Sequence, residues 1–143
     1  MKISTKGRYG LRIMTDIALN EKEGCVSIKD IANREALSEK YLEQIINLLS
    51  KQGLVKSIRG ARGGYHLTRD AKDITVEEIL IATEGSLAPV ACAADSECCE
   101  NYCDCVTSFI WTKIYAAIID VVHNITLEDL ARRSVGGGKC AGC

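Results

Sequence analysis

Five cysteines lie close together in one short stretch of this chain, and their thiols are the side chains whose type and spacing most clearly suggest chemistry. The stretch CAADSECCENYCDC spans residues 92–105 and holds five of the eight cysteines of the 143-residue chain. Thiolates are soft ligands that suit zinc or an iron–sulfur cluster, and paired thiols can also form a disulfide. The candidate ligands are Cys92, Cys98, Cys99, Cys103 and Cys105.

The spacing of these cysteines leaves zinc and a cluster about equally favoured. Structural zinc usually needs two close cysteine pairs set well apart. Cys99 and Cys103 form one such pair, and only Cys140 and Cys143 could supply another. Ferredoxin-type runs with two-residue spacers are absent. A structural disulfide is less favoured, because we expect a cytoplasmic chain, whose thiols stay reduced.

Acidic residues are interleaved with the cysteines. Negative charge next to a thiol should raise its pKa in the metal-free protein and lower the reduction potential of a bound cluster. The acidic neighbours are Asp95, Glu97, Glu100 and Asp104.

The charge of the chain is divided between its two halves. Residues 1–72 hold 14 Lys and Arg against 8 Asp and Glu, whereas residues 73–143 hold 4 against 11. A basic first half predicts contact with a polyanion such as nucleic acid. The N-terminal segment carries several cations without a long apolar run, and the longest apolar stretch, residues 114–122, includes Asp120. We therefore expect neither a signal peptide nor a membrane span.

The order of the elements that must position these residues is that of a winged helix-turn-helix. Apolar periodicity predicts a helix over residues 9–19, and Ser27 and Ser38 are N-caps of the next two helices. Two β-prone runs, residues 54–58 and 65–68, flank RGARGG as a hairpin, and Thr75 with Glu78 forms a capping box that opens a fourth helix. The predicted fold is mainly α with a small β-hairpin wing.

The third helix of this plan enters the DNA major groove by its N-terminal end. Gln44 can pair with adenine, Lys40 can reach guanine or a phosphate, and Glu43 can accept from cytosine. Tyr41 either packs in the core or reaches a phosphate. The candidate contacts on this helix are Ser38, Lys40, Tyr41, Glu43 and Gln44.

The hairpin tip is rich in arginine and glycine. Arg59, Gly60 and Arg62 form a slim basic tip suited to a narrow, negative minor groove, although a solvent-exposed basic turn would look the same. Gly63 and Gly64 are expected to allow positive φ in the turn. A nucleotide-phosphate loop is disfavoured, because no Gly-Lys-Ser/Thr follows.

A strongly apolar helix follows the cysteines. Its apolar residues fill more than one helical stripe, so it predicts burial on its own domain and on a second copy of the chain. A twofold dimer would place two recognition helices about 34–36 Å apart on a near-palindromic duplex. Thr126 and Asp129 cap a last helix to about Arg133. The expected units are residues 1–84 (DNA-binding domain), 85–105 (cysteine loop), 106–133 (dimerisation and last helices) and 134–143 (flexible tail).

Taken together, these motifs resemble those of the IscR-type (Rrf-type) winged-helix regulators. The resemblance covers residues 1–133 and rests on MKISTKGRYGLRIM, SEKYLEQI, SIRGARGGYHL, the cysteine segment, CVTSFIW and HNITLEDL in that order. It implies a homodimeric bacterial transcription factor that binds double-stranded DNA. It also implies an iron–sulfur cluster held between the fourth helix and the long helix.

The resemblance assigns the ligands only in part. Cys92 matches the first family cysteine and Cys105 the third, while Cys98 and Cys99 both fit the second position. The fourth ligand stays open, because Ser108 stands where the best-known member has histidine. Cys103, the unused member of the Cys98/Cys99 pair, or a partner-chain group could complete the site. A 2Fe–2S and a 4Fe–4S centre both remain possible.

The function expected from the sequence is a DNA-binding regulator controlled by a cluster. The alternative is a zinc-binding or cluster-free thiol-switch repressor of the same fold. A redox enzyme is disfavoured, since no catalytic Ser/His/Asp set is visible. Cys25 is expected to be an ordinary small residue, and His123 a surface or interface residue too far from Cys105 to be a ligand. Cys140 and Cys143 form either a redox pair or a pair without a fixed role.

Overall fold

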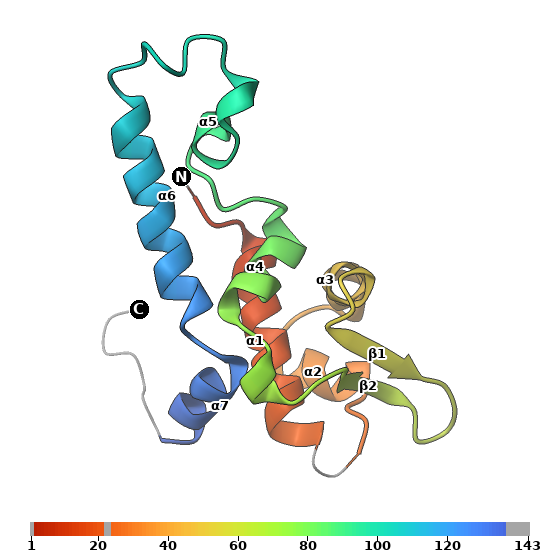
Figure 1. Ribbon diagram of the computed structural model, residues 1–143. Helices are drawn as coiled ribbons and strands as arrows, with labels where there is room; N and C mark the ends of the chain where they lie inside the picture. The colour runs from red at the N-terminus through yellow and green to blue at the C-terminus, as the bar shows by residue number, and fades with distance from the viewer. Residues whose placement is uncertain (1, 22–23, 137–143) are drawn as a thin grey trace.

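The computed structural model describes residues 2–21 and 24–136, and its elements follow the predicted order (Figure 1). The prediction of a mainly helical chain with a two-stranded wing is confirmed. The elements are α1 (Thr5–Asn20), α2 (Ile28–Glu35), α3 (Glu39–Lys51), β1 (Val55–Ile58), β2 (Gly64–Leu67), η2 (Ala71–Asp73), α4 (Val76–Glu84), α5 (Ala91–Ala94), η3 (Ser96–Cys98), α6 (Ser108–His123) and α7 (Leu127–Val135).

Most helix starts lie where local capping residues predict them. Ser27 and Ser38 accept hydrogen bonds from the amides of Asp30 and Tyr41, and both Thr75 and Thr126 form complete capping boxes. The predicted start of α1 at Tyr9 is wrong, because Ser4 caps the helix from Thr5 onward.

The turn between α2 and α3 is tight. Ala36 ends α2 in the left-handed conformation, with φ 54°, and the Leu37 amide donates to the Ala32 carbonyl at 3.1 Å. Ser38 then caps α3. Three residues therefore join the two helices of the helix-turn-helix.

The hairpin is anchored to the body through an extended segment before α2. β1 and β2 are antiparallel, with Val55 opposite Leu67 and Ile58 opposite Gly64. Val26 exchanges backbone hydrogen bonds of 2.9 and 2.8 Å with Tyr65. Because Val26 immediately precedes the Ser27 cap of α2, the wing and the helix-turn-helix are fixed to each other.

The expectation of positive φ at Gly63 and Gly64 is wrong. Within the turn, Gly60 takes the positive value, 125°. The other two are glycines because backbone approaches them closely: a Cβ would lie 2.3 Å from the Ile58 carbonyl oxygen at Gly63 and 2.5 Å from the Val26 carbonyl oxygen at Gly64.

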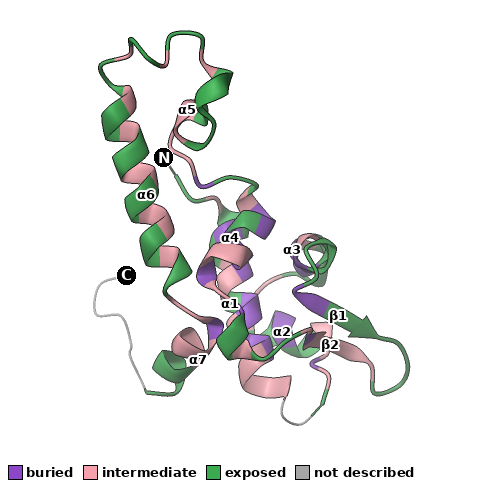
Figure 2. Ribbon diagram, viewed as in Figure 1, coloured by how far each residue is buried: buried purple, intermediate pink, exposed green. Residues whose placement is uncertain are grey.

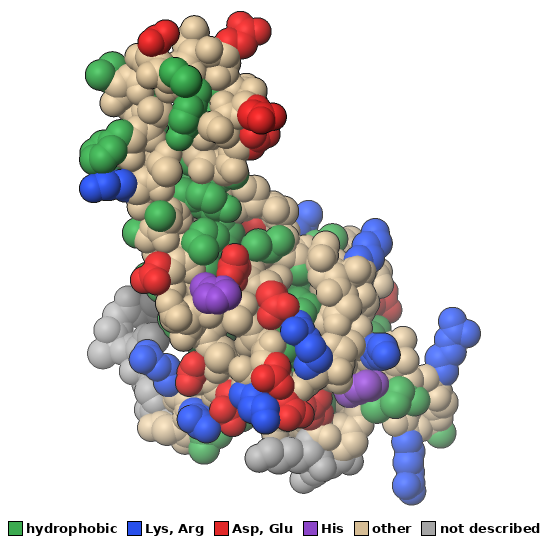
Figure 3. Space-filling model, viewed as in Figure 1, with side chains coloured by type: hydrophobic (Ala, Val, Ile, Leu, Met, Phe, Trp, Pro, Cys, Tyr) green, Lys and Arg blue, Asp and Glu red, His purple; other side chains and the backbone are tan. Residues whose placement is uncertain are grey.

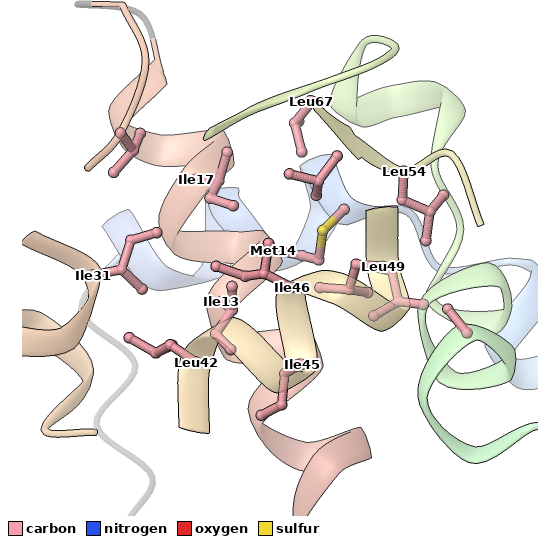
Figure 4. Close-up of a cluster of buried hydrophobic side chains, with 14 of the residues drawn as sticks. Ile13, Met14, Ile17, Ile31, Leu42, Ile45, Ile46, Leu49, Leu54 and Leu67 are labelled. Atoms are coloured by element: carbon pink, nitrogen blue, oxygen red, sulfur yellow. The ribbon is translucent and has the colours of Figure 1, made fainter. Parts of the chain in front are cut away.

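The main core joins α1, α2, α3 and the hairpin. Figure 4 shows side chains from these elements converging on Met14, and the buried residues are aliphatic almost throughout. An ion pair lies beside this core: the carboxylate of Asp16, whose side chain is 6 % exposed, accepts hydrogen bonds of 2.7 and 2.8 Å from Arg34. The largest fully buried side chains are Ile13, Met14, Ile17, Ile31, Leu42, Ile45, Ile46, Leu49, Leu54, Ile74, Ile79 and Leu127.

The α6 helix stands beside the body and runs from the cysteine segment toward α7 (Figure 1). Its lower part packs on α4, where Tyr115, Ile118 and Val122 contact a small cluster around Leu80. None of its residues is fully buried (Figure 2). The α7 helix returns to the body and ends at Val135, two residues beyond the predicted end. Within the described residues, no helix is long and apolar enough to cross a membrane.

Candidate nucleic-acid interface and cysteine segment

The α3 helix has one buried and one polar face. Leu42, Ile45, Ile46 and Leu49 lie in the core. The opposite face carries polar side chains that are free to meet a partner. Of the residues predicted to contact DNA from this helix, the exposed ones are Ser38, Lys40, Glu43 and Gln44.

Tyr41 is the predicted contact residue that packs inward. It is half-buried and meets the ring of Tyr9 edge-on, with ring centres 5.9 Å apart. The guanidinium of Arg12 lies over the other ring of this pair, 5.2 Å from the centre of Tyr9. Of the two predicted positions for Tyr41, the structure shows the one packed on the core. Its contact with Tyr9 joins α3 to α1.

The hairpin tip extends away from the body. Arg59, Gly60 and Arg62 are all exposed, and Figure 3 shows basic side chains projecting from this end of the molecule. The sequence reasoning missed Ile58, which is 52 % exposed because its cross-strand partner, Gly64, has no side chain to cover it. The tip thus combines two exposed arginines with one exposed apolar side chain.

The cysteine segment contains short helical turns where a loop was expected. Cys92 lies on α5 and Cys98 ends η3. Cys92, Cys99 and Cys105 are half-buried, whereas Cys98 and Cys103 are exposed, and all five are free thiols. Among the described residues, no three Cys, His, Asp or Glu side chains gather closely enough to hold a metal ion. The donor types fit a thiophilic metal or cluster, although no three of them are gathered among the described residues.

The electrostatics of the segment differ from one cysteine to the next. Partial loss of hydration raises the pKa of the Cys98 thiol, and the nearby Asp95, Cys92 and Cys99 raise it further. The pKa of Cys105 is instead lowered, because the Thr107 hydroxyl hydrogen-bonds to its sulfur at 3.2 Å. Of the four acidic neighbours, Asp95 raises the pKa of Cys98 as expected, second to the loss of hydration, whereas none contributes to the lowered pKa of Cys105.

Other residues singled out from the sequence lie elsewhere. Ser108 is the first residue of α6, and its hydroxyl donates to the Cys105 carbonyl at 2.8 Å. His123 is an exposed surface residue, as predicted, and pairs with Glu77 of α4 at 2.7 Å. Cys25 is a half-buried free thiol before α2. Cys140 and Cys143 lie outside the described residues.

Two helices joined by a three-residue turn, a polar face on the second helix and a basic hairpin together define a winged-helix DNA-binding protein. The chain is similar to protein rrf2 of Nitratidesulfovibrio vulgaris, 43 % identical over 92 % of this chain and 88 % of the relative. It is also similar to the transcriptional regulator CymR of Bacillus subtilis, 45 % identical over 95 % and 94 % of the two chains.

Solved structures give the same result. The structure of CymR, described as the global cysteine regulator of B. subtilis, matches with a TM-score of 0.77, covering 93 % of this chain and 98 % of that one at 44 % identity. T. potens IscR matches with a TM-score of 0.75, covering 94 % and 88 % at 44 % identity. Residues 3–133 match the family model Rrf2, described as an iron-dependent transcriptional regulator. The chain belongs to this Rrf2 family of non-enzymatic, DNA-binding transcriptional regulators.

Proposed function

We propose that an iron–sulfur cluster in the segment 92–105 controls how this regulator binds its operator. The observation that carries the proposal is the set of five free thiols on a short segment joined directly to α6. Four thiolates are the usual ligands of 2Fe–2S and 4Fe–4S centres. The family model's description as iron-dependent supports a metal of this kind.

The ligands we assign are Cys92, Cys105 and one of Cys98 and Cys99. The fourth position falls to Cys103, the remaining member of that pair, or a partner-chain group. Because no three of the free thiols are gathered in the described residues, binding must draw the segment closer together. A bound cluster would supply a redox- and iron-sensitive crosslink at this point. Since the segment runs directly into α6, its folding acts on the start of that helix.

Purification under nitrogen, followed by iron and sulfide analysis and a visible spectrum, tests the cluster directly. We expect brown protein with stoichiometric iron and sulfide. Changing Cys92 or Cys105 to alanine should lower the iron content, as should changing at least one of Cys98 and Cys99. Cys25→Ala, a half-buried thiol outside the segment, should retain the iron. Iron-free protein, or full iron retention in all four segment variants, contradicts the proposal.

The control of DNA binding needs a second measurement. Duplexes selected by the protein from a random pool should bind the iron-loaded and the chelator-treated chain with different affinity. The contacts we assign to that duplex are Ser38, Lys40, Glu43 and Gln44 at the start of α3 and Arg59, Gly60 and Arg62 of the wing. Equal affinity of the iron-loaded and the chelator-treated chain would show that the cluster does not control DNA binding.

A metal-free thiol switch is the second candidate, because Cys98 and Cys103 are exposed and reduced. Two such thiols can react with an oxidant without unfolding the domain. Mass spectrometry after mild peroxide treatment distinguishes this candidate: a disulfide within segment 92–105 that changes DNA affinity in iron-free protein favours the switch.

We also propose that α6 mediates a homodimer on a near-palindromic site. Its apolar side chains are left uncovered: Val106 is 96 % and Phe109 65 % exposed. Ala117 and Val121 help to line an apolar groove along the same helix, and Figure 3 shows apolar side chains along this part of the surface. A second copy would cover both features.

Two neighbouring alanines provide a matched test of the dimer. Ala117 lines the groove, whereas Ala116, also exposed, does not. Light scattering should show that Ala117→Glu shifts the protein to monomer while Ala116→Glu remains a dimer. A monomeric wild-type chain, or a dimer that Ala117→Glu leaves intact, contradicts this assignment.

A further inference from the structure

A second candidate site lies away from both the wing and the cysteine segment. A cavity of about 1040 Å³ opens between α1, α2 and the end of α7. Its apolar wall is formed by Leu11, Leu19 and Leu130, and its polar wall includes Arg12, Glu35 and Arg133. A concave site with one apolar wall and a few convergent charges is typical of small-molecule binding.

The charges at this cavity are not fully matched. Asp16 and Arg34, which also line it, satisfy each other through two hydrogen bonds. Glu35 is different: its side chain is only 15 % exposed, and Arg12 Nε lies 2.6 Å from Oε2. That contact is too poorly aligned to be a hydrogen bond, so Oε2 has no donor among the described residues. Glu35 is therefore ion-paired with Arg12, but its buried Oε2 accepts no hydrogen bond, a costly arrangement that a ligand donor can relieve.

Arg133 supplies the complementary group. Its guanidinium lies at the cavity with no ion-pair or hydrogen-bond partner in the described part of the chain, whereas the neighbouring Arg132 pairs with Glu128 at 3.1 Å. The cavity therefore offers one unpaired cation, one carboxylate whose buried oxygen accepts no hydrogen bond, and an apolar wall. Guanidinium groups bind carboxylates through paired, charge-assisted hydrogen bonds.

We propose that this cavity binds a free α-amino acid with an apolar side chain. The ligand carboxylate binds Arg133, its ammonium donates to Glu35, and its side chain packs on the three leucines. A nucleotide fits less well, because two of the three arginines at the cavity already face acidic partners. Arg12 also lies over Tyr9, which contacts Tyr41 of α3. Arg12 at the cavity therefore touches Tyr9, whose contact with Tyr41 joins α1 to the recognition helix α3.

Ligand-observed NMR titrations of the full chain test the proposal, using L-valine, L-leucine, L-isoleucine, L-methionine and L-phenylalanine as probes. At least one should bind saturably. Arg133→Gln should weaken its binding by about tenfold or more, and Glu35→Gln should weaken it as well. Arg132→Gln, the same change one residue earlier at a satisfied arginine, should bind as wild type does.

Two analogues of the bound amino acid separate the two ends of the ligand. The carboxamide lacks the charge that Arg133 would bind, and the deaminated acid lacks the ammonium that Glu35 would bind, so each should bind about tenfold more weakly or worse. The proposal is overturned if no probe binds saturably, if Arg133→Gln binds as wild type does, or if either analogue binds equally well. These readouts use neither iron nor DNA, so they stand apart from the function proposed above.

Discussion

The ion pair between Asp16 and Arg34 provides a quantitative test, because it joins α1 to α2 of the helix-turn-helix. Exposed ion pairs contribute about 0.2–1 kcal/mol, whereas breaking a fully buried pair costs about 3–5 kcal/mol. Here the Asp16 side chain is 6 % exposed and the Arg34 side chain 40 % exposed. The pair lies between these limits, and water around Arg34 reduces its strength. We expect a pairwise coupling of about 1–2 kcal/mol.

A double-mutant cycle with Asp16→Asn and Arg34→Gln measures that coupling. Each single change should lower the free energy of unfolding by about 2 kcal/mol, because it weakens or removes the two charge-assisted hydrogen bonds between these side chains. The double variant should lose about 1–2 kcal/mol less than the sum of the two. Urea unfolding at one fixed protein concentration is the assay, since self-association would alter apparent stability.

Glu128 and Arg132 form the control pair for this cycle. They lie one helical turn apart on α7 at 3.1 Å, with side chains 41 % and 71 % exposed. Their coupling should be about 0.3–0.5 kcal/mol. A coupling between Asp16 and Arg34 no larger than that of the control pair would refute the argument that burial strengthens the contact between α1 and α2.

Three further predictions concern the wing and α4. Gly64→Ala should lower the free energy of unfolding by about 2 kcal/mol in urea titrations, because its Cβ would meet a backbone carbonyl at 2.5 Å and separate the hairpin from Val26. Arg59→Ala should weaken operator binding and reduce the slope of log affinity against log salt by about one unit, as measured by fluorescence anisotropy. Glu78→Gln should lower stability at pH 7 and have little effect in strong acid. Burial raises the pKa of Glu78, but hydrogen bonds from Thr75 and Arg69 outweigh this and lower it below the ordinary 4.5. The Glu78 carboxylate therefore stabilises the fold above that pH, and the contribution is lost as pH falls through the lowered pKa.

Each of these predictions has a result that would contradict it. Gly53→Ala strains a left-handed residue, with φ 71°, without meeting any neighbour, so its cost measures backbone strain alone. A Gly64→Ala variant as stable as the wild type would show that the carbonyl contact is unimportant. An unchanged salt slope for Arg59→Ala would show that Arg59 of the wing does not contact a DNA phosphate. If the stability difference between Glu78→Gln and the wild type stays constant from pH 7 to strong acid, the ionisation of Glu78 is not its cause.

The sequence by itself determined the features that depend on a few neighbouring residues. Ser27, Ser38 and Thr75 mark their helix starts, because a cap needs only a side-chain oxygen and an amide two or three residues away. The polar face of α3 follows from the 3.6-residue period in the same way. The exposed DNA-contact candidates and the hairpin tip were therefore predictable as a pattern.

Tertiary structure decided what depends on residues far apart in the chain. Ser4 is a local cap at the start of α1, but Glu84, 80 residues from Ser4, accepts further hydrogen bonds from the Ser4 and Gly7 amides that only tertiary packing supplies. Gly64 is close to Val26 only after the hairpin folds back. The cavity between α1, α2 and α7 likewise has no counterpart in any local motif. Contacts of this kind depend on how the helices pack, which no local spacing specifies, whereas helix caps and periodicity are set within a turn or two of the chain.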